Sequence, residues 1–585
     1  MRKLGVSGCR ILLSGSSLLG SFALSLGVTL LASRGAIAQS IPSGGSIPDN
    51  VPETVDQSTP RPARDVPFLV EPPTSPATPI LESPNGQPAP APTVPPVLIR
   101  VEQIEVKGST ILEREIAALV QPLEHSEVTF EQLVQLRSEI TALYTSRGYI
   151  TSGAFLPNNQ DLSSGVVQIQ VVEGELEAIQ IDGLERLNPS YVRSRLQLAG
   201  QTPFNQQQLE QTLQLLQVDP LLRRVNAELT AGSAPGRSIL HVALQEAPPL
   251  NASLGTDNYQ PTSIGSAQLS VAGSYVNLLG RGDRFFAQYG RTNGLNLYDI
   301  GYTIPVNPRD GTVTLRYNTN DSRIIENAVD ELDIRSDAET WSLEFRQPLT
   351  RSVTDEFALG LALDLRRSQT YILGDIPFSF SVGAEDGESK VTVLRLTQDW
   401  VHRGRTQVLA ARSQFSLGLD AFDATINDSG TDGRFLKWLG QFQWVQQVGG
   451  RSLLVTRLNA QLTPDSLLSP ERIGLGGQDT VRGYAQNQIV ADNAIWAAVE
   501  VRLPLTPNSN RLQLIPFIEA GHAWNNELPD PSPDLLVGAG IGLNWQVLRG
   551  LDLRVDYGIP LVNADSQGNS LQDNGIYVSL RYSPF

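Results

Sequence analysis

Large apolar residues alternate with small or polar residues through the second half of this chain. In residues 357–365 every second residue is Phe or Leu, and the residues between them include Gly360 and Asp364. Residues 551–557 repeat the pattern with charged residues at the intervening positions. Successive side chains of a β-strand point to opposite faces, so the pattern predicts strands with one apolar face and one wet face.

Such strands recur from about residue 248 to residue 585 and favour an all-β transmembrane barrel with lipid outside and a polar lumen inside. A soluble β-sandwich is the alternative, because its sheets also carry one apolar face. Strands of about 9–14 residues, a charged inner face and an export signal favour the barrel. We count sixteen antiparallel strands, and fourteen or eighteen would also close as an even number. Their expected starts lie near residues 250, 265, 283, 296, 311, 338, 355, 390, 405, 435, 451, 493, 511, 535, 550 and 575.

The beginning of the chain has the features of an export signal. Three basic side chains in the first ten residues precede an apolar run that ends before Ala36-Ile37-Ala38, which predicts a secretory signal peptide over residues 1–38. An uncleaved membrane anchor is the alternative, and the Ala-x-Ala site favours cleavage. Cys9, the only cysteine, lies in this segment, so we expect no disulfide in the mature chain. Residues 39–97 contain sixteen prolines and predict a disordered, partly polyproline linker.

Two similar units follow, over residues 98–175 and 176–247, and each has the element order βααββ. The first unit is expected to place strands and helices at 101–107, 112–120, 130–146, 149–156 and 166–172. The second is expected to place them at 176–181, 189–198, 205–217, 224–229 and 238–244. Thr129 is a suitable N-cap for one helix, and Gly148 stands where that helix should end.

Charge and composition exclude several classes of function. The net charge of −17, without any cluster of Lys and Arg, argues against nucleic acid as a partner. The four histidines lack the spacing of metal ligands, so no metal site is expected. No catalytic constellation stands out, and the sequence therefore predicts neither an enzyme nor a cofactor.

The longest stretch without a strand pattern in the predicted barrel is the segment 463–493, between the eleventh and twelfth strands. A long loop of this kind is usually functional or disordered. Its glycines are not followed by Lys-Ser/Thr, which argues against a phosphate cradle. The loop contains Val481, Arg482, Gly483 and Tyr484, which resemble the Val-Arg-Gly-Tyr/Phe motif of the barrel-assembly and protein-export superfamily. In that superfamily the loop folds back into the lumen.

A second motif lies on the expected thirteenth strand, where Phe517, Glu519 and Gly521 share the inward-facing parity. These residues resemble the Phe-x-Asp-x-Gly motif of the same superfamily, in which the acid pairs with the loop arginine. The resemblance therefore implies a pair between Arg482 and Glu519. Glu stands here in place of the usual Asp, and its extra methylene lengthens the side chain that makes the pair.

Three segments of the first βααββ unit indicate which family of the superfamily the chain resembles. Residues 143–151 read Leu-Tyr-Thr-Ser-Arg-Gly-Tyr-Ile-Thr, residues 156–157 read Leu-Pro, and residues 171–174 read Val-Val-Glu-Gly. They resemble the POTRA domain of two-partner secretion transporters, and the Asn-Leu-Leu-Gly-Arg-Gly-Asp turn at 277–283 also fits. Over about residues 99–585 the chain resembles the haemolysin and filamentous-haemagglutinin secretion-activation family. It departs in one respect, because no N-terminal plug helix is apparent between residues 39 and 96.

The resemblance implies a transporter of the cell outer membrane with two POTRA domains in the periplasm. The POTRA strand edges would capture an unfolded exoprotein of haemolysin or haemagglutinin type by β-augmentation, and the barrel would pass it outward. The implied partners are a secreted exoprotein with an N-terminal secretion domain, outer-membrane lipid and, for insertion of the chain itself, the barrel-assembly machinery. An insertase for other barrels is the alternative, although it usually carries more POTRA domains. A passive porin would need neither the POTRA pair nor the loop motif.

Overall fold

The structure is a computed structural model, and it describes residues 98–326, 329–507, 511–564 and 570–584. The predicted signal peptide, the proline-rich linker and the question of an N-terminal plug lie outside these residues. None of the helices in the described ranges is long and apolar enough to cross a membrane.

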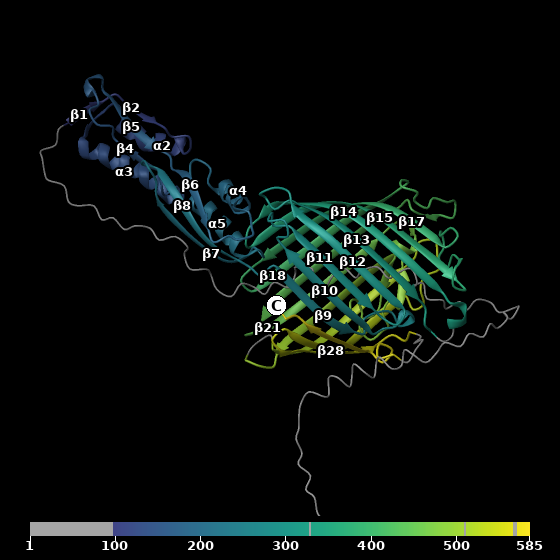
Figure 1. Ribbon diagram of the computed structural model, residues 1–585. Coiled ribbons are helices and arrows are strands. Elements are labelled where there is room, and N and C mark those ends of the chain that lie inside the picture. The colour runs from purple at the N-terminus through teal and green to yellow at the C-terminus, as the bar shows by residue number, and fades with distance from the viewer. Residues whose placement is uncertain (1–97, 327–328, 508–510, 565–569, 585) are drawn as a thin grey trace, which may run out of the picture. The chain divides into compact units, whose positions relative to one another are not determined.

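Two α+β units come first in the described chain, and they share one sheet topology (Figure 1). The first contains β1 Leu98–Val101, β2 Gln103–Lys107, α2 Glu113–Val120, η2 Gln121–Leu123, β3 Ser126–Thr129, α3 Phe130–Ser146, β4 Gly153–Phe155, η3 Leu162–Ser164 and β5 Val166–Val172. The second contains β6 Glu175–Asp182, α4 Pro189–Ala199, α5 Gln206–Gln217, β7 Leu222–Ala231 and β8 Arg237–Glu246. The sheet orders are β2-β5-β4 and β6-β8-β7, in which β2 runs parallel to β5 and β6 runs parallel to β8.

Both units have the βααββ order expected from the sequence, with two differences in the first. The expected strand at 149–156 is confined to β4, because Tyr149 N–H donates to Tyr144 O and Ser152 N–H donates to Tyr149 O. These bonds continue the turn that ends α3 and delay the strand. The sequence pattern also does not predict the ladder between β1 and β3, whose strands have only four residues each.

Side-chain caps fix the starts of α3 and α5. The Thr129 side chain accepts from Gln132 N–H while the Gln132 side chain accepts from Thr129 N–H, which completes a capping box on α3. Asn205 caps α5 by accepting from the N–H groups of Gln207 and Gln208. Each unit buries its own core between helices and sheet. The first core includes Leu133, Leu136, Ile140, Val167 and Ile169, and the second includes Val192, Leu196, Leu209, Leu213 and Leu240.

A glutamate at the end of the last strand closes each unit. Glu173 follows β5 and accepts from Thr110 N–H at 2.7 Å, from Ile111 N–H and from the Tyr144 hydroxyl. Glu246 ends β8 and accepts from the backbone N–H groups of residues 185, 186 and 187. In both units the backbone donors lie in the loop after the first long strand. Burial alone would raise the pKa of Glu173, but the hydrogen bonds from Thr110 and Tyr144 lower it below its usual range.

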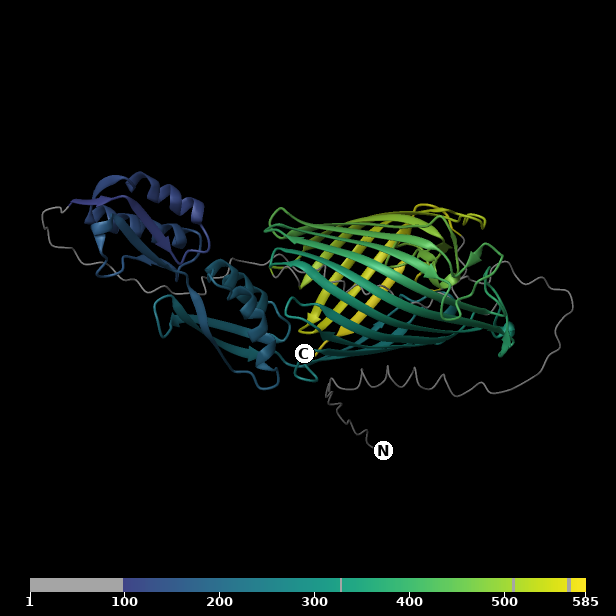
Figure 2. The ribbon, with the colours of Figure 1, turned by 90° about the horizontal axis from the view of Figure 1, so that it is seen from above.

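Within the described residues, sixteen long strands close into an antiparallel barrel, as the sequence predicts (Figures 1 and 2). They are β9 Leu250–Asp257, β10 Gln268–Val276, β11 Arg284–Arg291, β12 Leu295–Pro305, β13 Thr312–Arg323, β14 Arg335–Arg351, β15 Asp355–Ile372, β17 Glu388–Arg403, β18 Gln407–Leu419, β20 Leu436–Val448, β21 Ser452–Leu462, β25 Asn493–Pro504, β26 Leu512–Trp524, β27 Leu535–Leu548, β28 Leu551–Pro560 and β29 Ile576–Tyr582. Every one begins within three residues of its expected position. The two-residue β16 Ile376–Pro377 pairs with the end of β15, and β29 pairs with β9 to close the ring.

The two faces of the barrel wall differ in polarity. On β14 the side chains of Trp341, Leu343 and Phe345 face outward and are exposed. The inner face carries ion pairs between neighbouring strands, such as Arg316 on β13 with Asp299 on β12. This division fits lipid against the outer face and a hydrated lumen inside.

The Glu173 contact predicts an acid-dependent stability of the first α+β unit. A carboxyl whose folded-state pKa lies below its unfolded value stabilises the fold above about pH 4.3, and the contribution is lost as the pH falls through the folded-state pKa. Glu173→Gln should therefore lower the free energy of unfolding by about 1–3 kcal/mol near neutral pH and flatten its acid dependence. Urea unfolding of a fragment spanning residues 98–247, followed by circular dichroism at several pH values, measures both effects.

The control is Glu127→Gln, which changes an exposed glutamate of β3. This variant should leave the free energy of unfolding and its pH dependence close to those of the unchanged fragment. Equal losses for the two variants would contradict the proposed role of Glu173.

Candidate functional site

The segment between β21 and β25 lies on the lumen side of the wall, and we call it the lumen loop (residues 463–493). It contains β22 Ser466–Leu467, η6 Ser469–Glu471, β23 Ile473–Leu475 and β24 Ile489–Ala491, and β22 also pairs with β19 Thr431–Asp432. The sequence pattern predicts no strands in this segment, and that prediction is wrong for the short strands β22, β23 and β24. β23 and β24 form a hairpin with Leu475 opposite Ile489, and its apolar side chains pack on Ala494, Trp496 and Ala523 of the wall.

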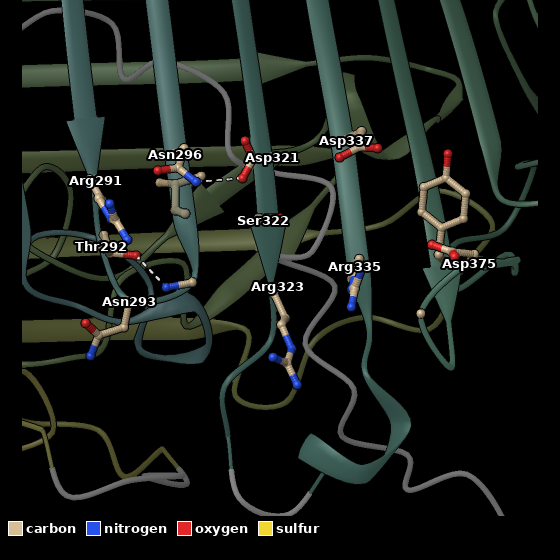
Figure 3. Close-up of a pocket in the computed structure, with 14 residues that line it drawn as sticks. Arg291, Thr292, Asn293, Asn296, Asp321, Ser322, Arg323, Arg335, Asp337 and Asp375 are labelled. Atoms are coloured by element: carbon tan, nitrogen blue, oxygen red, sulfur yellow. Dashed lines mark hydrogen bonds between the residues drawn. The ribbon is translucent and has the colours of Figure 1, made fainter. Parts of the chain in front are cut away.

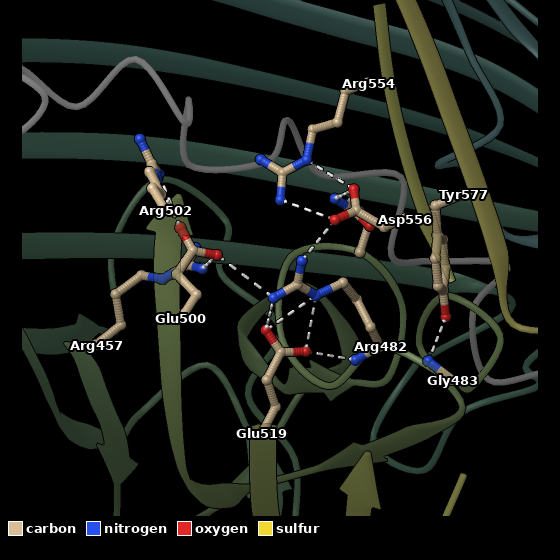
Figure 4. Close-up of polar contacts among 10 residues, drawn as sticks. Arg457, Arg482, Gly483, Glu500, Arg502, Glu519, Arg554, Asp556 and Tyr577 are labelled. Carbon is tan, nitrogen blue, oxygen red and sulfur yellow. Dashed lines mark hydrogen bonds and ion pairs between the residues drawn. The ribbon is translucent and has the colours of Figure 1, made fainter. Parts of the chain in front are cut away.

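Arg482 in this loop is completely buried among carboxylates (Figure 4). Its Nε lies 3.0 Å from Glu519 Oε1, its Nη2 lies 2.5 Å from the same oxygen, and its backbone N–H donates to Glu519 Oε2 at 2.7 Å. Nη1 donates to Asp556 at 2.8 Å, and Nη2 lies 3.4 Å from a Glu500 oxygen. The structure thus brings Arg482 and Glu519 together through both the side chain and the backbone of the arginine.

Arg482 belongs to a wider charge cluster on the inner wall. The cluster contains four guanidinium groups and three carboxylates, from Arg457, Arg482, Arg502, Arg554, Glu500, Glu519 and Asp556. Among the described residues, Glu519 forms its ion pair with Arg482 alone, whereas Glu500 and Asp556 also pair with wall arginines. Removing one partner of a buried pair costs about 3–5 kcal/mol, so this contact is a strong local constraint on the loop.

The other residues of the loop motif fix its main chain. Val481 is fully buried in the apolar cluster of the hairpin. Gly483 has a φ of 107°, a conformation in which a side chain would be strained, and its N–H donates to the Tyr577 hydroxyl at 2.8 Å. The Tyr577 hydroxyl donates in turn to Tyr484 O at 2.6 Å. The motif is therefore held by main-chain contacts as well as by the arginine.

The three motif residues of β26 are buried on the lumen side. The Phe517 ring lies under the guanidinium group, with Arg482 Cζ 3.4 Å from the ring centroid. Glu519 is the partner described above. Gly521 leaves room for the loop, because a Cβ at this position would lie 3.3 Å from Val481 Cγ2.

Glycines on β27 and β28 bring the backbone of the wall against the backbone of the loop. A Cβ on Gly538 would collide with Arg482 O, and a Cβ on Gly558 would lie 2.5 Å from Gly483 N. Residues 538–542 read Gly-Ala-Gly-Ile-Gly, so glycine recurs with period two on the inner face. Along this part of the wall, main-chain contact replaces side-chain contact.

The sequence motifs identify Arg482 and Glu519 and miss the rest of the cluster. Asp556 belongs to the alternation that predicts a polar inner face, but parity does not say which lumen charge meets the loop. Glu500 gives no separate signal for the same reason. The glycines at 538–542 are a signal that sequence reasoning missed, because repeated glycine in a strand indicates close approach of another backbone.

A separate polar hollow lies at the ends of β11 to β15 (Figure 3). Its lining is mainly polar and includes the charged residues Arg291, Asp321, Arg323, Arg335, Asp337 and Asp375, but no residue of the lumen loop. Ser336, between two lining residues of β14, is fully buried, so its charged neighbours face outward. Arg323 and Arg335 both pair with Asp333 with about half of each arginine side chain exposed, and such pairs contribute little energy. We therefore take the lumen loop as the candidate functional site.

Family comparison covers most of the described chain. The family model described as haemolysin secretion/activation protein ShlB/FhaC/HecB matches residues 236–545, and the POTRA domain, ShlB-type, matches residues 99–174. The outer membrane transporter CdiB of Escherichia coli O6:K15:H31 (strain 536 / UPEC) is 27% identical over 462 residues, which cover 76% of each chain.

Solved structures agree with the family assignment. CdiB from Escherichia coli superposes with a TM-score of 0.64 at 26% identity and covers 89% of this chain and 94% of its own. CdiB from Acinetobacter baumannii, at 17% identity, has a TM-score of 0.61 over 97% of both chains and supports the fold alone. The first family model matches more than half of the length of this chain, and the chain therefore belongs to the haemolysin secretion/activation protein family ShlB/FhaC/HecB.

Proposed function

We propose that this outer-membrane protein secretes a partner exoprotein through its barrel, and that the lumen loop controls the passage. The observation that carries the proposal is the fully buried Arg482, which ties the loop to the inner wall. The hairpin of the loop adds apolar contacts with the wall, whereas the contacts of Arg482 with the wall carboxylates are ion pairs and hydrogen bonds. Water and charged groups of an incoming chain can replace such contacts, so the loop can leave the wall while the barrel stays closed.

The α+β units, which lie in the periplasm in this family, supply the first contact with the exoprotein. Their sheet orders leave β2 and β4 at the edges of one sheet and β6 and β7 at the edges of the other. β4 has three residues, while β6 and β7 have 8 and 10, so the edges of the second sheet offer the longer backbone templates. Each added main-chain hydrogen bond contributes about 0.5–1.5 kcal/mol. An extended segment of the exoprotein can therefore be bound and released one hydrogen bond at a time.

The cargo that fits this family is a large exoprotein of haemolysin or haemagglutinin type with an N-terminal secretion domain. An insertase for other barrels is the second candidate, because the wall motif and loop motif resemble those of the barrel-assembly superfamily. The match to a secretion family over residues 236–545 favours the exporter.

Arg482 variants test the role of the loop. Removal of the arginine should weaken docking of the lumen loop by about 3–5 kcal/mol. The population of the docked loop then falls by more than about a hundredfold. Arg482→Ala and Glu519→Ala should therefore insert as folded, heat-modifiable barrels, since the ring of backbone hydrogen bonds is intact, yet lose most secretion. Arg482→Lys should also fail, because an ammonium cannot make the paired bonds to Glu519, whereas Glu519→Asp should retain activity. The measurement is cargo in the medium beside barrel folding on gels.

The matched control is Arg316→Ala, which removes a lumen arginine that pairs with Asp299 on the neighbouring strand. It should secrete normally. Full secretion by Arg482→Ala, or a barrel that fails to assemble, would remove this residue from the mechanism.

Gly538 provides an independent test that leaves every charge in place. Gly538→Ala should displace the loop, because the new Cβ collides with Arg482 O, and secretion should fall towards the level of Arg482→Ala. Gly273→Ala is the control, since a Cβ there meets only Asn251 O at 3.7 Å. Normal secretion by both glycine variants would show that the close backbone approach is unimportant.

The α+β pair should bind cargo by itself. A fragment spanning residues 98–247 is expected to fold and to bind the N-terminal region of the exoprotein only while that region is unfolded, because β-augmentation needs an extended segment. Isothermal titration with the unfolded and the folded cargo region distinguishes the cases. Equal binding of both forms, or of neither, would argue against capture at strand edges.

A further inference from the structure

The lumen loop carries a second buried charge, Glu471 in η6, whose side chain is fully buried. Its Oε1 lies 2.6 Å from Arg366 Nη1 on β15 and 2.7 Å from Arg395 Nη2 on β17. Its Oε2 lies 2.6 Å from Lys437 Nζ on β20. Three cations from three wall strands thus converge on one carboxylate of the loop.

The charge balance at this point depends on the loop. Among the described residues, Asp364 on β15 is the one wall carboxylate that forms an ion pair with any of the three cations, and it pairs with Arg395. Without Glu471 the wall would hold three positive charges against one negative charge. The Glu471 carboxylate is therefore the complement of the wall rather than an incidental neighbour.

Backbone and apolar contacts at the same place support this assignment independently. Lys437 Nζ also donates to Glu471 O at 2.9 Å, and Gln461 Nε2 donates to that oxygen at 3.1 Å. Leu467 and Leu468 just before η6 form a buried apolar cluster, and their partners are Val391, Val393 and Phe435. The first limb of the loop (residues 463–475) is thus docked by charge, backbone and apolar contacts.

Arg482 and Glu471 of the loop contact different parts of the wall. Arg482 contacts acids on β25, β26 and β28, whereas Glu471 contacts bases on β15, β17 and β20. We infer that Glu471 is a positioning residue that anchors the first limb of the lumen loop independently of Arg482. Release of Arg482 alone then leaves the first limb docked on the wall at β15, β17 and β20, and passage of cargo requires both anchors to open. The link to passage rests on the proposed function, whereas the anchoring itself does not.

Amide hydrogen exchange on the full-length protein in detergent or lipid separates the two anchors. In Glu471→Gln we expect exchange in residues 466–475 to rise roughly a hundredfold or more, as for a buried pair that loses one partner, while residues 478–485 change little. Arg482→Ala should give the reverse pattern. Glu471→Asp, which keeps the charge, should restore part of the protection.

The matched control is Asp299→Asn, which neutralises a lumen acid that pairs with Arg316 on the wall. It should leave exchange in the loop unchanged. If Glu471→Gln does not fold, Leu468→Ala and the charge-balanced Glu471→Gln/Lys437→Met variant should expose the same residues. Unchanged exchange at 466–475, or an equal rise in both limbs or in the control, would overturn the inference.

Secretion by the same variants tests the link to passage. Glu471→Gln should lower secretion, because the proposed transport cycle has to return to the docked loop after each passage, and Glu471→Asp should retain part of it. A selective rise in exchange with normal secretion would support Glu471 as an anchor of the loop but exclude it from the transport step. Failure of the transporter proposal alone would leave the exchange result standing, so the two failures are distinguishable.

Discussion

Closure of the hydrogen-bonded ring is the constraint on which the rest of this structure depends. In lipid each unpaired backbone N–H or C=O costs several kcal/mol, so strands can span only as a barrel without edges. Here β29 returns to pair with β9 and removes the last edge. Because the ring holds itself, the inner face does not need a dry core and can carry pairs such as Arg316 with Asp299. The charged lumen is therefore a consequence of closure, and the charged lumen in turn makes an ionically held loop possible.

The loop and the wall are complementary in sign at two places. The loop offers an arginine where the wall gathers carboxylates and a glutamate where the wall gathers cations. A shift of the loop by a few residues would place like charges together or leave buried charges unpaired, which costs several kcal/mol. Two anchors of opposite sign therefore define the register of the loop as well as its attachment.

The parts that could be predicted from the sequence are those with a long periodic signal. Strand starts follow from alternation that continues across the whole barrel, and α3 follows from Thr129 and the apolar positions after it. The pair of Arg482 and Glu519 follows only from resemblance to a known motif. Asp556 and Glu500 could not be predicted, because every charge on an inward-facing strand position looks alike until the loop is placed. Glu471 could not be predicted either, because it lies in a part of the loop without a strand pattern. The short strands β22 to β24 have two or three residues each and are below the length at which a period can be recognised.

The glycines that face the loop on β27 and β28 also decide what has to rearrange when the loop moves. Where Gly538 and Gly558 meet the loop, backbone lies on backbone and the wall has no side chain to reorient. Glycine has no rotamer freedom to lose on contact, so the wall side of this contact orders at no side-chain entropy cost. The only rearrangements are those of the loop itself and of the ion pairs around it. In the proposed transport cycle, opening and reclosing of the loop therefore leave the wall unchanged, so that each cycle begins from the same surface.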